Sequence, residues 1–134
     1  MNVRTKNIGN ITVIYLYGRL DIFEAELAEK DIFDIADKNN SSDIILVLDG
    51  LDYLSSSGLR IFISLKRHLE NNGCQLFLSN KSNNAVNIFF RIVNIKDMFV
   101  IFETEEEALH YLAGAGNIYR AKLPHDEPVL SVNK

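Results

Sequence analysis

The spacing of apolar residues along the chain first has a period of two and then a period near 3.6, typical of strands and helices respectively. Two stretches rich in β-branched residues, Val3–Ile8 and Ile11–Tyr17, flank Gly9-Asn10, and this pattern indicates a β-hairpin. After Asp21 the spacing predicts an amphipathic helix that runs to about Lys38. The expected apolar face of this helix consists of Phe23, Leu27, Ile32 and Ile35.

The rest of the chain alternates between strand and helix patterns. In order, these patterns predict a strand at Ile44–Leu48, a helix at about Ser57–Asn71, a strand at Gln75–Leu78, a helix at Ala85–Ile92, a strand at Phe99–Phe102 and a helix from Thr104 to about Leu112. The helix in the middle is expected to bury Leu59, Phe62, Leu65 and Leu69. Thr104 and Glu107 have the three-residue spacing of a capping box at the start of the last helix.

An initial hairpin followed by alternating helices and strands, β-β-α-β-α-β-α-β-α, predicts an α/β fold. We expect a mixed, mostly parallel sheet of about four to five strands with about four helices. Residues 1–113 are expected to form one domain. The segment 114–134 contains Pro124 and Pro128 and little periodicity, so we expect it to be a C-terminal extension.

Composition and charge exclude several classes of function. The net charge of −4, without a basic cluster, disfavours nucleic-acid binding. The single cysteine, Cys74, cannot form an internal disulfide, and no apolar run approaches the ~20 residues of a membrane helix, so we expect a cytoplasmic protein without membrane insertion. The three histidines have no metal-ligand spacing and the glycine motifs of nucleotide-binding loops are absent, so neither a metal nor a cofactor is expected.

The segment Leu48–Leu59 contains the strongest candidate chemistry, because an apolar strand leads through acidic residues into three serines. Ser55-Ser56-Ser57 stands where a helix begins. A hydroxyl there can cap the helix, or it can be phosphorylated at a place that favours anions, and the local pattern allows both. Asp49 and Asp52 are expected to be loop residues that make Asx-type turns. A phosphate-accepting role for Asp49 is disfavoured, because the first strands do not end in the acidic pair that would hold Mg²⁺.

Three pieces of the sequence, in the right order, resemble the STAS domain of the bacterial anti-sigma factor antagonist family. Gly18-Arg19-Leu20-Asp21 matches the family's Gly-x-Leu-Asp before the first helix. The segment Leu48–Leu59 matches the family's strand and its Asp-Ser-Ser/Thr-Gly turn, with Ser55 at the place of the usual Asp. Phe102-Glu103-Thr104, followed by Glu106–Leu109, resembles the closing Phe-Glu-Thr and Glu-Glu-Ala-Leu. The resemblance runs from about residue 11 to residue 112 and implies a STAS-like fold.

The resemblance also implies a regulatory protein rather than an enzyme. The unmodified protein would bind an anti-sigma factor that is also a serine kinase and brings the ATP. Phosphorylation of Ser56, with Ser55 and Ser57 as alternative acceptors, would release it, and a serine phosphatase would reset it. The residues expected to bind the partner are Asp21, Asp49, Asp52, Ser55, Ser56, Ser57 and Gly58, of which Asp21 is also a candidate cap for the first helix.

Two other functions stay open at this point. The first is a STAS subunit that is not phosphorylated and acts as a binding or scaffold module of a transport or signalling complex. The serine at position 55, in place of the usual Asp, favours this alternative. A hydrolase that uses the Ser/Asp segment is disfavoured, because no motif positions a general base. The sequence makes no prediction of the oligomeric state.

Overall fold

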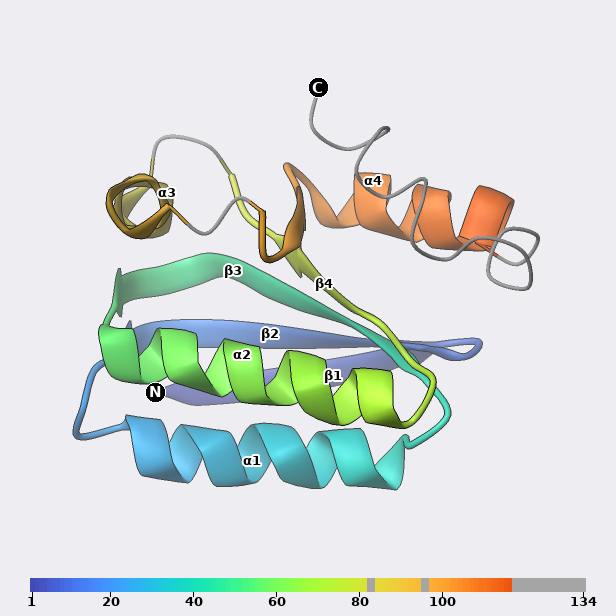
Figure 1. The fold of residues 1–134 in the computed structure, drawn as a ribbon, viewed down its shortest axis with the longest axis horizontal. Coiled ribbons are helices and arrows are strands. Elements are labelled where there is room, and N and C mark those ends of the chain that lie inside the picture. Colours follow the sequence, from blue (N-terminus) through green and yellow to red (C-terminus); the bar gives the residue numbers. More distant parts are fainter. Residues whose placement is uncertain (82–83, 95–96, 117–134) are drawn as a thin grey trace.

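Residues 1–81, 84–94 and 97–116 are described by the structure, a computed structural model (Figure 1). The strands are β1 (Asn2–Ile8), β2 (Ile11–Leu20), β3 (Asp43–Leu54), β4 (Leu76–Ser79) and β5 (Val100–Phe102). The helices are α1 (Ala25–Lys38), α2 (Ser56–Asn71), α3 (Ala85–Val93) and α4 (Glu105–His110), which continues as a π-helical turn, η1 (Tyr111–Gly116). This order confirms the predicted succession of elements.

The strands form one mixed sheet in the order β1-β2-β3-β4-β5. β1 and β2 are antiparallel and Ile8 pairs with Ile11 across the Gly9-Asn10 turn. Gly9 has a φ of 61°, the left-handed conformation that such a two-residue turn favours. Every other pair of neighbours is parallel. The predicted α/β class and the mostly parallel sheet are therefore confirmed.

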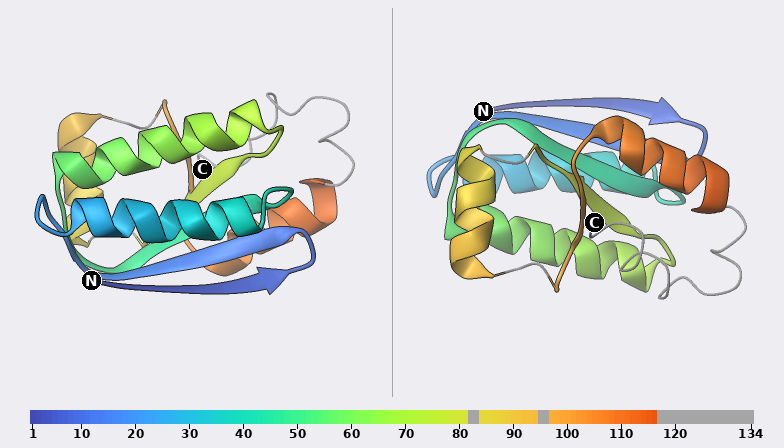
Figure 2. Two further views of the ribbon diagram at one scale, coloured as in Figure 1. Left: turned by 90° about the horizontal axis from the view of Figure 1, so that it is seen from below. Right: turned by 90° about the horizontal axis from the view of Figure 1, so that it is seen from above.

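Helices cover both faces of this sheet. α1 and α2 lie side by side on one face, whereas α4 lies on the other, and α3 lies beside the end of the sheet where α2 begins (Figures 1 and 2). Two hydrophobic clusters form the core, and successive residues of β3 belong to them in turn. Ile44 and Leu46 pack with α1 and α2, while Ile45 and Val47 pack with α4. Because both faces are covered, this part of β3 is apolar at every position.

Both β2 and β3 are longer than the sequence pattern predicted. Beyond Val47, β3 leaves β4 and continues to Leu54 as a two-stranded ribbon with β2 alone. Leu51 and Leu54 are buried there, while Asp49 and Asp52 are exposed. The prediction that these two carboxylates lie in a loop was wrong. The ladder to β2 and the burial of the leucines outweigh the low strand propensity of Asp and Gly.

The predicted apolar face of the first helix was also partly wrong. α1 begins at Ala25, so Phe23 precedes the helix and is 88% exposed, and Leu27 is 61% exposed. The buried positions are instead Ala28, Ile32 and Ala36, which repeat every four residues. Alanines are a weak apolar signal in a sequence, although their small side chains let a helix lie close to the sheet. In α2 the prediction held for Phe62, Leu65 and Leu69, whereas Leu59 is half-buried.

α4 begins as the capping pattern predicted, because Thr104 Oγ1 accepts the Glu107 N–H at 3.1 Å. The Glu107 carboxylate accepts from the N–H of Glu103 rather than that of Thr104. The helix is held to the hairpin by Glu105, whose carboxylate accepts the Tyr15 hydroxyl at 2.8 Å and lies 2.9 Å from Lys6 Nζ. Of the predicted extension, residues 114–116 belong to η1 and the rest lies outside the described residues.

Candidate functional site

The junction between β3 and α2 is built around Ser55. This residue has an extended backbone (φ −106°, ψ 172°) and is the N-cap of α2. Its Oγ accepts the Gly58 N–H at 3.2 Å and donates to the Leu20 carbonyl oxygen at 2.8 Å. The same carbonyl accepts the Ser55 N–H at 3.1 Å. A single hydroxyl therefore caps α2 and ties its start to the end of β2.

Ser56 and Ser57 are the first two helical residues of α2 and differ in their surroundings. Ser56 is exposed and Ser57 is half-buried. Within the described part of the chain, neither hydroxyl makes a hydrogen bond. The first turn of α2 contains no acidic residue, so no carboxylate there neutralises the positive end of the helix dipole. Of the three serines, Ser55 is engaged in hydrogen bonds, Ser57 is partly covered, and Ser56 is free and open to solvent.

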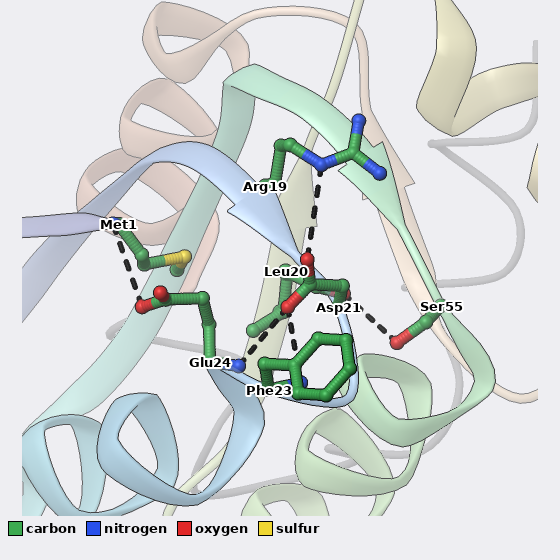
Figure 3. A network of polar contacts seen from close by, with 7 residues as sticks. All are labelled: Met1, Arg19, Leu20, Asp21, Phe23, Glu24 and Ser55. Carbon is green, nitrogen blue, oxygen red and sulfur yellow. Dashed lines mark hydrogen bonds and ion pairs between the residues drawn. The ribbon is translucent and has the colours of Figure 1, made fainter.

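Asp21 organises the connection from β2 to α1 (Figure 3). Its Oδ1 accepts the N–H groups of Phe23 at 3.1 Å and of Glu24 at 3.0 Å. Its Oδ2 lies 3.7 Å from Arg19 Nε. These contacts make Asp21 the cap of the turn that leads into α1, whereas the N-cap of the helix itself is Glu24, without a side-chain cap hydrogen bond. The helix-cap role that the sequence offered for Asp21 is therefore not confirmed. This turn is joined to α2 through the Leu20 carbonyl.

A cation–π contact joins the C-terminal ends of β2 and β3. Arg19 and Tyr53 are partners in the ladder, and the Arg19 guanidinium lies 4.4 Å from the centroid of the Tyr53 ring. Arg19 is thus engaged by both an aromatic face and a carboxylate. On the other side of the turn, Glu24 lies 3.6 Å from the Met1 amino group (Figure 3).

Four exposed apolar residues lie on the segments that adjoin this junction, namely the turn after β2, the first turn of α1 and the end of β3, and the sequence pattern had assigned none of them to a site. Their exposed fractions are 68% for Ile22, 88% for Phe23, 61% for Leu27 and 41% for Tyr53. We call these four residues the apolar rim. Single exposed apolar side chains are common, but a group on adjoining segments is typical of a protein-contact surface. The sequence signal for it is the apolar pair Ile22-Phe23 directly after Asp21, where the chain turns.

Gly58 is buried, and its packing explains why a glycine stands there. A Cβ atom at this position would lie 2.7 Å from Leu20 Cγ and 2.7 Å from Leu54 Cδ1. Both leucines are themselves buried. The first turn of α2 therefore approaches the β2–β3 ribbon more closely than any side chain would permit. In this conformation Gly58 positions the helix start and presents no surface of its own.

Asp49 and Asp52 of β3 lie at different distances from the serines. Asp52 is exposed and stands two residues before Leu54, near the start of α2. Asp49 stands five residues before Leu54, about 16 Å away at the rise of a strand. Its Oδ1 accepts the Lys81 N–H at 3.3 Å. The structure therefore brings Asp21, Asp52 and the three serines to one end of the ribbon, and places Asp49 further back, beside the segment that follows β4.

No group of three His, Cys, Asp or Glu side chains that could hold a metal ion is found among residues 1–81, 84–94 and 97–116. In that same part of the chain, no helix is long and apolar enough to cross a membrane.

Comparison with known proteins assigns this chain to a family. The STAS domain family model matches residues 2–108, and the chain belongs to this family. The anti-sigma-B factor antagonist of Bacillus subtilis (strain 168) is 24% identical over 106 residues, which cover 79% of this chain and 94% of that protein. The predicted resemblance to the STAS domain of anti-sigma factor antagonists is confirmed.

Solved structures of similar fold include other proteins described as anti-sigma factor antagonists. One, from Mycobacterium paratuberculosis, has a TM-score of 0.75 and 16% identity, covering 84% of this chain and 93% of that one. SpoIIAA from Bacillus, in its unphosphorylated form, has a TM-score of 0.67 and 24% identity, covering 84% and 97% respectively. SpoIIAA has also been solved in its phosphorylated form. At these identities the likeness establishes the fold.

Proposed function

We propose that this protein is an anti-sigma factor antagonist of a partner-switching pathway and acts in the cytoplasm. Unmodified, it binds an anti-sigma factor that is also a serine kinase. The kinase transfers the γ-phosphoryl group of its ATP to Ser56 Oγ, which loses its proton, and the modified protein is released. A serine phosphatase removes the phosphate and restores binding. The protein itself needs no cofactor, because the kinase brings the ATP. The observation that carries this proposal is the free, exposed hydroxyl of Ser56 beside the apolar rim.

The hydrogen bonds of the three serines favour Ser56 as the acceptor. Ser55 Oγ is both a donor to Leu20 and an acceptor from Gly58, so its phosphorylation would break the cap and the tie to β2. Ser57 is half-buried and therefore less accessible to a kinase. Ser56 needs no rearrangement to reach a kinase. Although Ser55 replaces the Asp that the family usually has, its hydrogen bonds leave the next hydroxyl free.

The fold is expected to tolerate the modification. A phosphoserine carries about −1.5 to −2 charges at neutral pH. At the first position of α2 this charge faces the positive end of the helix dipole, an interaction that contributes roughly 0.3–1 kcal/mol. The first turn contains no carboxylate that would oppose it. The conformation of the described residues should therefore persist after phosphorylation.

Phosphorylation is expected to weaken binding to the partner. The apolar rim supplies contact area on the segments next to Ser56, and a dianion beside it must lose its hydration when the partner covers it. Asp21 and Asp52, at the same end of the ribbon, add like charge. Asp49 stands about 16 Å before Leu54 along the strand, a separation beyond the Debye length of roughly 8 Å at physiological salt, so its charge contributes less. A penalty of ~2.7 kcal/mol already weakens binding about 100-fold.

Intact-mass measurement and phosphopeptide mapping test this proposal. The protein and its Ser56→Ala variant are incubated with each candidate anti-sigma kinase of the host and ATP, and binding of each kinase is measured in parallel. We expect a single gain of about 80 Da on the wild type that is absent in Ser56→Ala. A gain that persists in Ser56→Ala moves the acceptor to Ser55 or Ser57. A kinase that binds but transfers nothing contradicts the switch and leaves a constitutive binding module.

A further inference from the structure

Arg60 lies one helical turn after Ser56, on the same face of α2. Residues four apart on a helix are neighbours, with Cβ atoms roughly 5–6 Å apart. Side chains on a helix also tilt toward its N-terminus, so the Arg60 side chain covers the surface on the Ser56 side of its own Cα. Both residues are exposed, which leaves room for the arginine to extend along this face.

Among the described residues, Arg60 makes no ion pair, hydrogen bond or cation–π contact. Two other cations, one on the ribbon and one on α2, are already paired. Arg19 lies against Asp21 and the Tyr53 ring, and Lys66, further along α2, lies 2.6 Å from Glu70. Arg60 is therefore the cation within helical reach of Ser56 whose charge is not already paired.

We propose that Arg60 holds the phosphate of phosphorylated Ser56 in an i,i+4 pair on the surface of α2. The guanidinium offers a planar fork of N–H donors that matches phosphate oxygens. The acidic group stands N-terminal to the basic one, which is the favourable orientation on a helix. Asp21, Glu24 and Asp52 are the carboxylates on adjoining segments, and they repel the phosphate away from the ribbon, toward α2.

The pair changes what phosphorylation does to the protein surface. Beyond adding a dianion, the modification takes the Arg60 charge away from any partner that used it. The occurrence of this state in the cell rests on the proposed function. The pair itself depends only on a phosphate at Ser56, so it can be examined without a kinase.

The test uses full-length protein in which phosphoserine is incorporated at position 56 during translation, in the wild-type, Arg60→Gln, Arg60→Lys and Arg67→Gln backgrounds. The ³¹P chemical shift is followed through the second ionisation of the phosphate. Because Arg60 favours the dianion, Arg60→Gln should raise this pKa by about 0.3 pH unit or more. The phosphate pKa in Arg60→Lys should lie between the values of the wild type and Arg60→Gln. Arg67→Gln, removed by about 16 Å of helix rise from Ser56, should leave the value unchanged.

The urea midpoint of unfolding is the second readout, measured with and without the phosphate. Phosphorylation should raise the midpoint more in the wild type and in Arg67→Gln than in Arg60→Gln. Equal phosphate titrations in Arg60→Gln and Arg67→Gln would overturn the pair. That result would leave the kinase experiment on Ser56 unaffected. Conversely, a failure to find any phosphorylating kinase would count against the proposed function without altering either titration.

Discussion

At the level of single residues, the chain differs from its family's usual motif at Ser55, which stands in place of an Asp. As a hydroxyl it both accepts the Gly58 N–H and donates to the Leu20 carbonyl oxygen. An ionised Asp at this position could accept the first of these bonds but has no proton for the second. The serine therefore adds a link between the start of α2 and the end of β2, and the free hydroxyl of Ser56 follows directly after it.

Replacing Ser55 tests both of its hydrogen bonds. Ser55→Ala removes the cap and the tie, so we expect the free energy of unfolding to fall by about 1–2 kcal/mol. Ser55→Thr keeps a hydroxyl with the same donor and acceptor groups and should lose less than half of that. Urea denaturation of the three proteins measures the difference. An alanine variant as stable as the wild type would show that neither bond contributes.

Phe23 tests the apolar rim as a contact surface. Since its ring is 88% exposed, Phe23→Ala should change stability by no more than about 0.5 kcal/mol. Its affinity for the anti-sigma factor should nevertheless fall by about tenfold or more, as for an aromatic contact at an interface. Ile8→Ala is the matched control, because Ile8 is 41% exposed at the far end of the β1–β2 hairpin. Isothermal titration calorimetry measures both, and equal losses would argue against the rim.

The sequence pattern placed the three serines at a helix start, as the structure has them, but only the family resemblance and not the local pattern singled out Ser56. The three residues are identical in type, and what separates them is the carbonyl of Leu20, which lies 35 positions earlier in the chain. The apolar rim was missed for a similar reason. Phe23 and Leu27 fit a helical period, and only the start of α1 at Ala25 reveals that neither is in the core.

Among the secondary-structure elements, the two-stranded ribbon of β2 and β3 positions the residues of the site. The sequence predicted the apolar first half of β3 well, because residues 44–48 are apolar throughout. The second half contains Asp49, Gly50 and Asp52, residues that strands usually lack. Gly50 has a packing reason, since a Cβ there would lie 2.4 Å from Tyr17 Cδ1 and 2.8 Å from the Leu16 carbonyl oxygen. Pairing with β2 is a long-range interaction, which local propensity cannot predict.

The contact of α4 with the hairpin gives a prediction for alkaline pH. Burial of its ring raises the pKa of Tyr15 above the ordinary value of 10.0, and the hydrogen bond to Glu105 raises it further. The hydrogen bond to Glu105 also raises the pKa of Lys6 well above its usual range. In both cases the folded state holds its proton more tightly than the unfolded chain. The stabilisation is fully present below the unfolded pKa and is lost as the pH rises through the folded one.

The unfolding free energy should therefore fall between about pH 9 and about pH 12, and Tyr15→Phe should remove part of that dependence. Urea denaturation across this range measures it. Tyr17→Phe serves as the control, because the Tyr17 hydroxyl makes no hydrogen bond within the part of the chain that the structure describes. If Tyr15→Phe and Tyr17→Phe give the same alkaline profile, the contact of Tyr15 with Glu105 does not stabilise the fold.

In the whole molecule, the segments that form the candidate site lie together at one end. The turn after β2, the end of the β2–β3 ribbon, the start of α2 and helix α3 all lie at that end, opposite the β1–β2 turn (Figures 1 and 2). The sequence predicted the order of elements and the class of sheet, since both follow from hydrophobic period and connectivity. The proximity of Asp21 to the serines required the parallel pairing of β2 with β3, in which Leu20 and Leu54 are partners.

In the proposed function, a phosphate on Ser56 switches off the binding of an anti-sigma factor. The most direct test titrates the cognate anti-sigma factor with two forms of the full-length protein, unmodified and carrying phosphoserine at position 56, under identical salt. We expect measurable binding of the unmodified form and an affinity for the phosphorylated form that is lower by about 100-fold or more. Equal affinities of the two forms would contradict it.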